Sequence, residues 1–190
     1  MFSLKTKTSC IDNPYLEHFK KFNSDKYEVE FITKRDKAVK EFAWAIPNQK
    51  ALELLVDYSP LIEMGAGTGY WASLVQQMGG EIISYDIKPY KNEQANGQFT
   101  KVLKGGPEVL KKYPNYNLFL CWPPYNDPMA FECLNTFTGR YLIYVGEGGG
   151  GCNGDNKFWE LLCSDYKEIK IIHIPQWCCI NDYLTVWKAK

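Results

Sequence analysis

Residues 61–71 read LIEMGAGTGYW, and this stretch decides the fold. Glycines alternate with other residues at Gly65, Gly67 and Gly69, and the acidic Glu63 stands two residues before the first of them. Because glycine has no Cβ, the backbone can turn tightly at these positions and a ligand can approach it closely. A carboxylate at the end of a buried strand also needs polar partners. The pattern predicts a ligand-binding loop between a strand and a helix, and a glycine-rich turn that binds nothing is the alternative.

The glycine spacing excludes two common kinds of nucleotide site. The fingerprint of nicotinamide and flavin sites requires a glycine at position 70, which holds Tyr70 instead. A phosphate-binding loop requires a Gly-Lys-Ser/Thr sequence, and none follows the glycines.

Downstream of the glycines, short apolar runs alternate with amphipathic stretches. The expected strands cover residues 61–64, 82–85, 99–103, 118–121, 141–145, 168–174 and 183–188. The expected helices between them cover residues 68–78, 107–112, 129–137 and 155–166. Strands alternating with helices predict a parallel sheet that is covered by helices on both faces. The segment 175–182 is too short for a helix, so the last strand should pair antiparallel.

The first sixty residues indicate helices rather than strands. We expect helices over 15–22 and about 34–45, and a third that begins after the N-cap Asn48. The 190 residues suffice for one α/β domain. The sequence therefore predicts an N-terminal helical segment, 1–58, that packs on a compact doubly wound core, 59–190.

In an open α/β sheet the ligand lies beyond the carboxyl ends of the strands. Asp86 follows the second strand there, and an aspartate in this place can accept hydrogen bonds from both hydroxyls of a ribose. A turn or N-cap aspartate is the alternative. After the third strand, Gly105 offers only backbone groups.

Two further loops follow strands at the same edge. Residues 122–125 read WPPY, in which two prolines hold the chain extended and the aromatic ring offers a face to a planar or cationic substrate. A rigid loop with a core tryptophan is the alternative. After the fifth strand come Glu147 and the glycine cluster 148–151, which would form either a mobile substrate lid or a disordered connector. The aromatic and proline segment 42–48, just before the core, would either pack against the bound ligand together with Tyr70 and Trp71 or pack in the core, and core packing is expected for Trp44.

The glycine loop, of the form Glu-x-Gly-x-Gly-x-Gly, resembles motif I of the class I S-adenosylmethionine-dependent methyltransferases. Asp86 occupies the place of the motif II acid. Residues 122–125 resemble motif IV of the amino-methyltransferases, Asp/Asn/Ser-Pro-Pro-Tyr/Phe. From an Ala-Ile-Pro segment at 45–47 to the Gly-Glu pair at 146–147, the chain is similar to a subgroup of small methyltransferase-like proteins with a WPPY motif.

The resemblance implies a Rossmann-like sheet of seven strands in the order 3-2-1-4-5-7-6, and S-adenosyl-L-methionine as cofactor. The residues implied to bind it are Glu63, Gly65, Ala66, Gly67, Gly69, Tyr70, Trp71, Asp86, Ile87, Gly105 and Trp122. The residues implied in catalysis are Pro123, whose carbonyl would orient an amine, and Tyr125, whose ring would do the same. From its position after the fifth strand, Glu147 would either accept a proton from the substrate or pair with a cationic substrate. Trp122 departs from motif IV because it cannot accept the hydrogen bond of a target nitrogen. The Pro-Pro-Tyr loop thus favours a nitrogen acceptor and Trp122 disfavours it.

Three functions follow from these residues. The first is a methyltransferase acting on a small molecule or an exposed macromolecular group. The second is a non-catalytic S-adenosylmethionine-binding scaffold or partner subunit, which the missing polar residue at position 122 supports. The third is another transfer on the same fold, such as a polyamine synthase, although the paired acids that would hold a polyamine are not evident.

The composition limits which partners and bound groups we expect. The 22 basic and 22 acidic residues cancel, so charge gives no indication of a nucleic-acid partner, although a local lysine patch would still allow one. Seven cysteines without a Cys-x-x-Cys pair indicate neither a disulfide framework nor a zinc ribbon. Cys178 and Cys179 are expected to be buried thiols, a redox or metal site with His173 being the alternative. No carboxylate cluster suggests a metal.

Lys5 and Lys7 interrupt any N-terminal apolar run and no stretch is long enough to span a membrane, so we expect a cytoplasmic protein.

Overall fold

The computed structural model describes residues 11–22, 29–89 and 98–190; Lys5, Lys7 and Cys10 lie outside these ranges. The described helices are α1 (Pro14–Phe22), α2 (Val29–Glu41), α3 (Gln49–Asp57), α4 (Tyr70–Gln77), the 3₁₀ helix η1 (Pro107–Lys112), α5 (Met129–Thr136) and α6 (Asn156–Asp165). The described strands are β1 (Leu61–Met64), β2 (Ile82–Asp86), β3 (Val102–Lys104), β4 (Asn117–Cys121), β5 (Tyr141–Gly146), β6 (Tyr166–His173) and β7 (Tyr183–Ala189).

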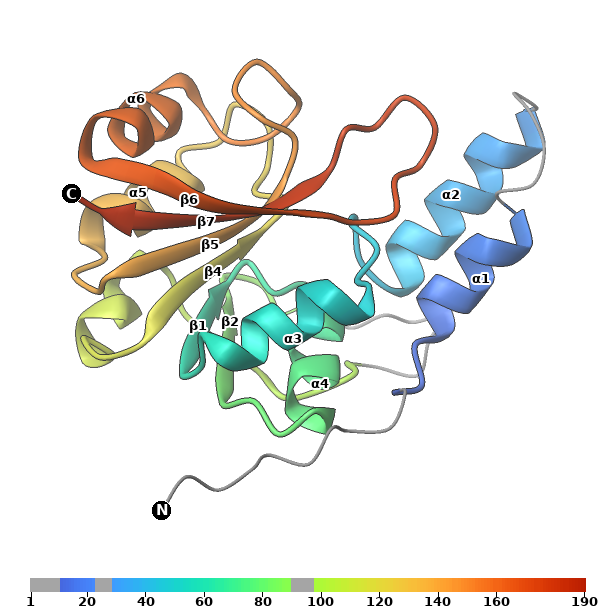
Figure 1. The fold of residues 1–190 in the computed structure, drawn as a ribbon, viewed down its shortest axis with the longest axis horizontal. Coiled ribbons are helices and arrows are strands. Elements are labelled where there is room, and N and C mark those ends of the chain that lie inside the picture. Colours follow the sequence, from blue (N-terminus) through green and yellow to red (C-terminus); the bar gives the residue numbers. More distant parts are fainter. Residues whose placement is uncertain (1–10, 23–28, 90–97) are drawn as a thin grey trace.

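The strands form one sheet in the order β3-β2-β1-β4-β5-β7-β6, which confirms the predicted topology (Figure 1). β1 pairs parallel with β2 and β4, β2 with β3, and β4 with β5, whereas β7 pairs antiparallel with both β5 and β6. The strand order reverses between β1 and β4. The carboxyl ends of these two strands therefore border the place where an open α/β sheet binds its ligand.

Helices cover both faces of the sheet, and consecutive residues of β1 divide between the two cores (Figure 1). Leu61 belongs to a core that side chains of α1, α3 and α4 complete. Ile62 belongs to a second core with side chains of η1, α5 and α6. All four residues of β1 are buried, as expected for a central parallel strand. The glycine loop leaves this fixed strand directly.

Two helices begin at side-chain caps, of which Asn48 was predicted. The side chain of Asn48 accepts a hydrogen bond of 2.9 Å from the amide of Ala51, and that of Asp155 accepts one of 2.9 Å from Phe158. Both caps satisfy amides that lack partners inside the helix.

Several predicted boundaries are wrong: α2 begins at Val29 rather than near residue 34, and β6 begins at Tyr166 rather than residue 168. Three other differences have a cause in the contacts. α2 ends at Glu41 rather than near residue 45, and residues 42–47 run without regular structure because their carbonyls bond side chains of α4 and its preceding loop. α4 begins at Tyr70 rather than residue 68, since Gly69 has a φ of +71°. β3 begins at Val102 rather than residue 99, because the amide of Phe99 donates to the carbonyl of Thr68 at 3.0 Å instead of joining the ladder.

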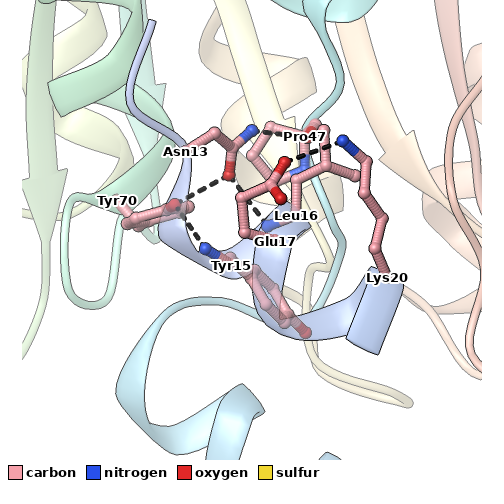
Figure 2. A network of polar contacts seen from close by, with 7 residues as sticks. All are labelled: Asn13, Tyr15, Leu16, Glu17, Lys20, Pro47 and Tyr70. Atoms are coloured by element: carbon pink, nitrogen blue, oxygen red, sulfur yellow. Dashed lines mark hydrogen bonds and ion pairs between the residues drawn. The ribbon is translucent and has the colours of Figure 1, made fainter. Parts of the chain in front are cut away.

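α1 is held against the rest of the fold through Asn13 (Figure 2). The side chain of Asn13 caps α1 by accepting from Leu16 at 3.0 Å, and it donates to the carbonyl of Pro47 at 2.8 Å. The hydroxyl of Tyr70 donates to the same Asn13 oxygen at 2.9 Å and accepts from the amide of Tyr15 at 3.1 Å. One buried network thus joins α1, the segment before α3, and the first residue of α4.

None of the helices in the described ranges has the length and apolar character that crossing a bilayer requires.

The Tyr70 hydroxyl gives a test of this network. Tyr70→Phe should lower the free energy of unfolding by about 1–3 kcal/mol, because it leaves the buried amide of Tyr15 without its partner. Urea titration of both proteins measures the difference. Tyr125→Phe, which removes a hydroxyl from a side chain that is 63% exposed, is the matched control and should change stability little. Equal losses in the two variants would contradict a stabilising role for the network.

Candidate functional site

The glycine loop between β1 and α4 has the conformation that its glycines permit. Gly65, Gly67 and Gly69 have φ values of +73°, +54° and +71°, in the left-handed region that other residues rarely adopt. A Cβ at Gly65 would lie 2.6 Å from the Cε of Met129, whereas a Cβ at Gly67 would meet nothing within 4 Å. The backbone at Gly67 therefore faces open space, as a cradle for a ligand requires.

Hydrogen bonds from both sides hold this loop. The hydroxyl of Thr68 donates to the carbonyl of Phe42, and the amide of Ala66 donates to the carbonyl of Tyr85 at 3.0 Å. The amide of Gly67 donates to Oδ2 of Asp86 at 3.0 Å. The loop is thereby fixed to the segment after α2 and to the end of β2.

Asp86 ends β2 beside the loop and is half-buried. Its Oδ2 accepts from Gly67, and its Oδ1 accepts from the amide of Lys88 at 2.8 Å. An ionised carboxylate offers about four acceptor sites, so each oxygen keeps capacity for one more donor. Asp86 can therefore receive two neighbouring hydroxyls while it holds the loop.

Two cavities adjoin at the loop. The larger measures about 410 Å³ and the smaller about 220 Å³, and both are lined by Trp44, Gly65, Gly67 and Cys121. The predicted residues in the larger cavity are Gly65, Gly67, Asp86, Ile87, Gly105, Trp122 and Pro123. Those in the smaller cavity are Glu63, Gly65, Ala66, Gly67, Tyr70 and Trp71. The fold therefore gathers most of the predicted site around one loop.

Glu63 lies in β1 at the smaller cavity and is 2% exposed. Burial raises the pKa of its carboxyl to about 8, although the hydroxyl of Ser84 opposes this by donating to Oε2 at 2.8 Å. The negative charge of Asp86 raises it further. Glu63 is thus a protonated acid at neutral pH that a nearby cation would ionise.

The apolar side of the smaller cavity comes from the start of α4. Tyr70 and Trp71 are both buried, and the indole nitrogen of Trp71 donates to the carbonyl of Ala45 at 3.1 Å. The segment 42–45 therefore closes over α4, and its carbonyls fix the aromatic side chains that line the cavity.

Trp44 is not a core residue, contrary to the sequence-based expectation. It is 52% exposed and lines both cavities. Its ring stacks on that of Trp122, with centroids 5.2 Å apart and planes inclined by 15°. The chain leaves helical structure at Glu41, and the side chain of Trp44 consequently turns to the cavity edge. The available signal in the sequence was the run of aromatic residues and a proline at 42–47.

The WPPY loop contributes unequally. Pro123 lines the larger cavity, but its carbonyl accepts from the amide of Gly154 at 3.2 Å and from the side chain of Asn153 at 3.3 Å. Tyr125 is 63% exposed and lines neither cavity. The geometry brings Pro123 to the site and leaves Tyr125 at its outer margin, so the catalytic role of Tyr125 stays a prediction.

Glu147 is buried beside the glycine cluster and lines neither cavity. Its Oε2 accepts from the amide of Cys152 at 2.9 Å, and its Oε1 accepts from that of Asn181 at 3.1 Å. Its own amide donates to the side chain of Asn153 at 2.8 Å. These bonds hold the 146–154 loop in turns, and proton transfer by Glu147 stays a prediction.

No sequence pattern pointed to Asp182, which is 1% exposed and accepts a hydrogen bond from the indole nitrogen of Trp122 at 2.8 Å. Cys178 and Cys179, expected to be buried, are exposed with sulfurs 3.6 Å apart, because the turn directs Trp177 into the core instead. Among the described residues, no group of three or more His, Cys, Asp and Glu side chains could hold a metal ion.

Comparison with solved structures identifies the fold. The chain is similar to magnesium protoporphyrin IX methyltransferase from Synechocystis PCC 6803 with bound S-adenosylmethionine, with a TM-score of 0.53 at 10% identity, over 96% of this chain and 100% of that one. It is similar to 1,6-didemethyltoxoflavin-N1-methyltransferase from Burkholderia thailandensis with bound S-adenosylhomocysteine, with a TM-score of 0.55 at 13% identity, over 96% and 92%. A TehB-like methyltransferase from Corynebacterium glutamicum gives 0.51 at 13% identity, over 85% and 97%.

The chain has a Rossmann-like methyltransferase fold. No family model matches the sequence, and no curated protein matches it. At identities of 10–13%, these comparisons show a similar fold only. The chemistry has to be argued from the residues of this chain.

The raised pKa of Glu63 predicts a pH-dependent stability. The folded chain keeps a proton that the unfolded chain loses as pH rises from the ordinary value of 4.5 to about 8, so this carboxyl makes the fold less stable over that window. Glu63→Gln has no such proton to lose and keeps an acceptor for Ser84. It should gain stability relative to the unmodified protein as pH rises from about 5 to about 8.

Urea titrations across that range check this prediction. The carboxyl of Asp182 is present in both proteins and cancels in the difference. A difference in stability that does not change with pH would contradict a buried, protonated Glu63.

Proposed function

We propose that the protein binds S-adenosyl-L-methionine at the glycine loop and transfers its methyl group to an acceptor. The observation that carries this proposal is the open backbone at Gly67, whose amide is bonded to Asp86 and which borders both cavities. Solved methyltransferases of the same fold contain S-adenosylmethionine or S-adenosylhomocysteine, which supports the choice of cofactor.

The residues of the two cavities fit the parts of this cofactor. Asp86 has acceptor capacity for the ribose hydroxyls, and Ile87 and the backbone of Gly105 line the larger cavity where the adenine would lie. The smaller cavity, with the acid Glu63 and the backbone of Ala66, suits the amino-acid end. An ammonium group there would favour the ionised form of Glu63.

When bound, the cofactor supplies a methyl group that is already activated by the positive sulfonium. The protein then has mainly to orient an acceptor and to exclude water. Trp44, which lines both cavities, stacks on Trp122, which lines the larger one, and their aromatic faces would attract a cation. Methyl transfer of this kind does not require a strong base, which agrees with a chain that contains only two histidines.

The acceptor remains a small molecule or an exposed macromolecular group in this proposal. The Pro-Pro-Tyr segment favours a nitrogen, as argued from motif IV. The carbonyl of Pro123 is already bonded to Gly154 and Asn153, and position 122 lacks a polar side chain. These two observations favour a second candidate function, a scaffold that binds the cofactor without transferring its methyl group.

Calorimetric titration with S-adenosylmethionine and S-adenosylhomocysteine tests the shared part of both candidates. Asp86→Ala should weaken both ligands by about 10- to 100-fold, because it removes charge-assisted hydrogen bonds and loosens the loop at Gly67. Asp86→Asn, which keeps one side-chain oxygen, should lose less. Asp36→Ala, on the exposed side of α2, is the control and should bind as the unmodified protein does. Unchanged affinity in Asp86→Ala would contradict the assignment of the ribose site.

Tritiated methyl transfer into cell extract distinguishes the enzyme from the scaffold. An enzyme should label a nucleic-acid, protein or small-molecule fraction, whereas a scaffold that binds the cofactor should label none. Tyr125→Ala should reduce labelling by more than tenfold while it changes cofactor affinity by less than about threefold, since Tyr125 lines neither cavity. Equal losses of labelling and affinity would show that the substrate does not meet Tyr125.

A further inference from the structure

Trp122 stands in a conformation that costs free energy. Its φ is +52°, in the left-handed region, where a bulky residue is a true outlier. Its amide donates to the carbonyl of Val145 at 2.8 Å, which fixes the turn at the end of β4. Strained residues of this kind persist where the surrounding structure determines them, and they gather at functional sites. The strain at Trp122 directs its indole to the edge of the larger cavity.

Asp182 holds the other end of this indole. Its Oδ1 accepts from the indole nitrogen of Trp122 at 2.8 Å, while its Oδ2 is buried and has no hydrogen-bond partner among the residues that the structure describes. The residue as a whole is 1% exposed. A buried carboxylate with a single donor is a costly way to satisfy one indole, because a neutral carbonyl would serve the same donor at a lower desolvation cost. Stability alone therefore does not account for Asp182.

The backbone on both sides of Asp182 is fixed. Its carbonyl accepts from the side chain of Gln176 at 2.7 Å, and the amide of the preceding Asn181 donates to Glu147 at 3.1 Å. The next residue, Tyr183, pairs with Gly146 at the carboxyl end of β5. Since β7 runs antiparallel, its first residues lie at the same sheet edge as the ligand loops. The backbone that carries Asp182 is therefore held in place where its side chain bonds Trp122.

We propose that Asp182 is a positioning residue of the methyl-transfer site, because its hydrogen bond to Trp122 holds the indole pair of Trp44 and Trp122 where the two cavities adjoin. Trp44 lines both cavities and depends on Trp122 for its stacking partner. Without the bond to Asp182 the indole of Trp122 can rotate, and the aromatic faces offered to the sulfonium are lost together. This proposal rests on the proposed function.

The charge around Asp182 agrees with such a role. Burial raises the pKa of its carboxyl to about 7, the bond from Trp122 opposes this, and the carboxylate of Glu147 adds to it. Within the described part of the chain, the charge of Asp182 in turn helps to raise the pKa of Tyr15, Cys121 and Tyr144. Perturbed carboxyls of this kind gather at functional sites.

Nuclear magnetic resonance of the ¹⁵N-labelled protein tests the positioning directly. The six tryptophans give separate indole N–H signals, and Trp122→Phe and Trp44→Phe assign the two of interest. Asp182→Ala should shift the Trp122 signal upfield, accelerate its exchange with water, and move the Trp44 signal as well. Asp182→Asn keeps an oxygen for the indole and should leave both signals near their original positions.

Calorimetric titration with S-adenosylhomocysteine measures how the same variants bind the ligand. Asp182→Ala should weaken binding about tenfold, Asp182→Asn less than about threefold, and Asp182→Ala should add nothing in the Trp122→Phe background. Asn117→Ala is the control for stability alone, because it removes a bond of 2.7 Å to Tyr58 at the opposite end of β4. It should lower stability without moving either indole signal or the affinity.

These measurements distinguish a failure of the positioning role of Asp182 from a failure of the proposed function. Unchanged indole signals or unchanged affinity in Asp182→Ala would overturn the proposal while the proposed function stood. Should that variant not fold, additive losses in Asp182→Asn and Trp122→Phe would overturn it equally. Failure of the unmodified protein to bind the ligand would instead overturn the proposed function, and the positioning role with it.

Discussion

The amide of Gly67 and the carboxylate of Asp86 form the bond on which the rest of the site depends. It joins the loop after β1 to the end of β2 at the place where the strand order reverses. A side chain at position 67 would need an unfavourable φ and would fill the space that the backbone now faces. In the proposed function the same carboxylate would also receive the ribose hydroxyls, so the geometry of the loop and the recognition of the ligand would depend on one residue.

The N-terminal helices complete the cavities. α1 is fixed to Tyr70 through Asn13, and the segment after α2 accepts hydrogen bonds from Thr68 and Trp71. Every one of these bonds ends on the glycine loop or on the first turn of α4. The helices therefore cover the sheet and also fix the positions of the aromatic side chains of the smaller cavity next to the loop. On the other side, the β6–β7 connector reaches the site through Asp182 and Trp122.

Local pattern was sufficient for the sheet and for much of the site. The apolar runs and the short connector at 175–182 predicted a parallel sheet with an antiparallel last strand, and the residues after β1 and β2 predicted the loop and Asp86. The strand order itself came from the resemblance to methyltransferases. Pattern did not reveal contacts between distant segments. Trp44 leaves the core because the chain stops being helical at Glu41, and Asp182 meets Trp122 across 60 residues of sequence. The carbonyl of Pro123 and the carboxylate of Glu147 are engaged by loop amides, which no spacing rule anticipates.

Crystals of the protein soaked with S-adenosylmethionine test the central claim most directly. The account predicts continuous density for the adenosyl amino acid across the two cavities, with its ribose hydroxyls on Asp86 and its amino-acid end beside Glu63. A glycine loop that stays empty at saturating cofactor, or that holds a pyrophosphate instead, would contradict it.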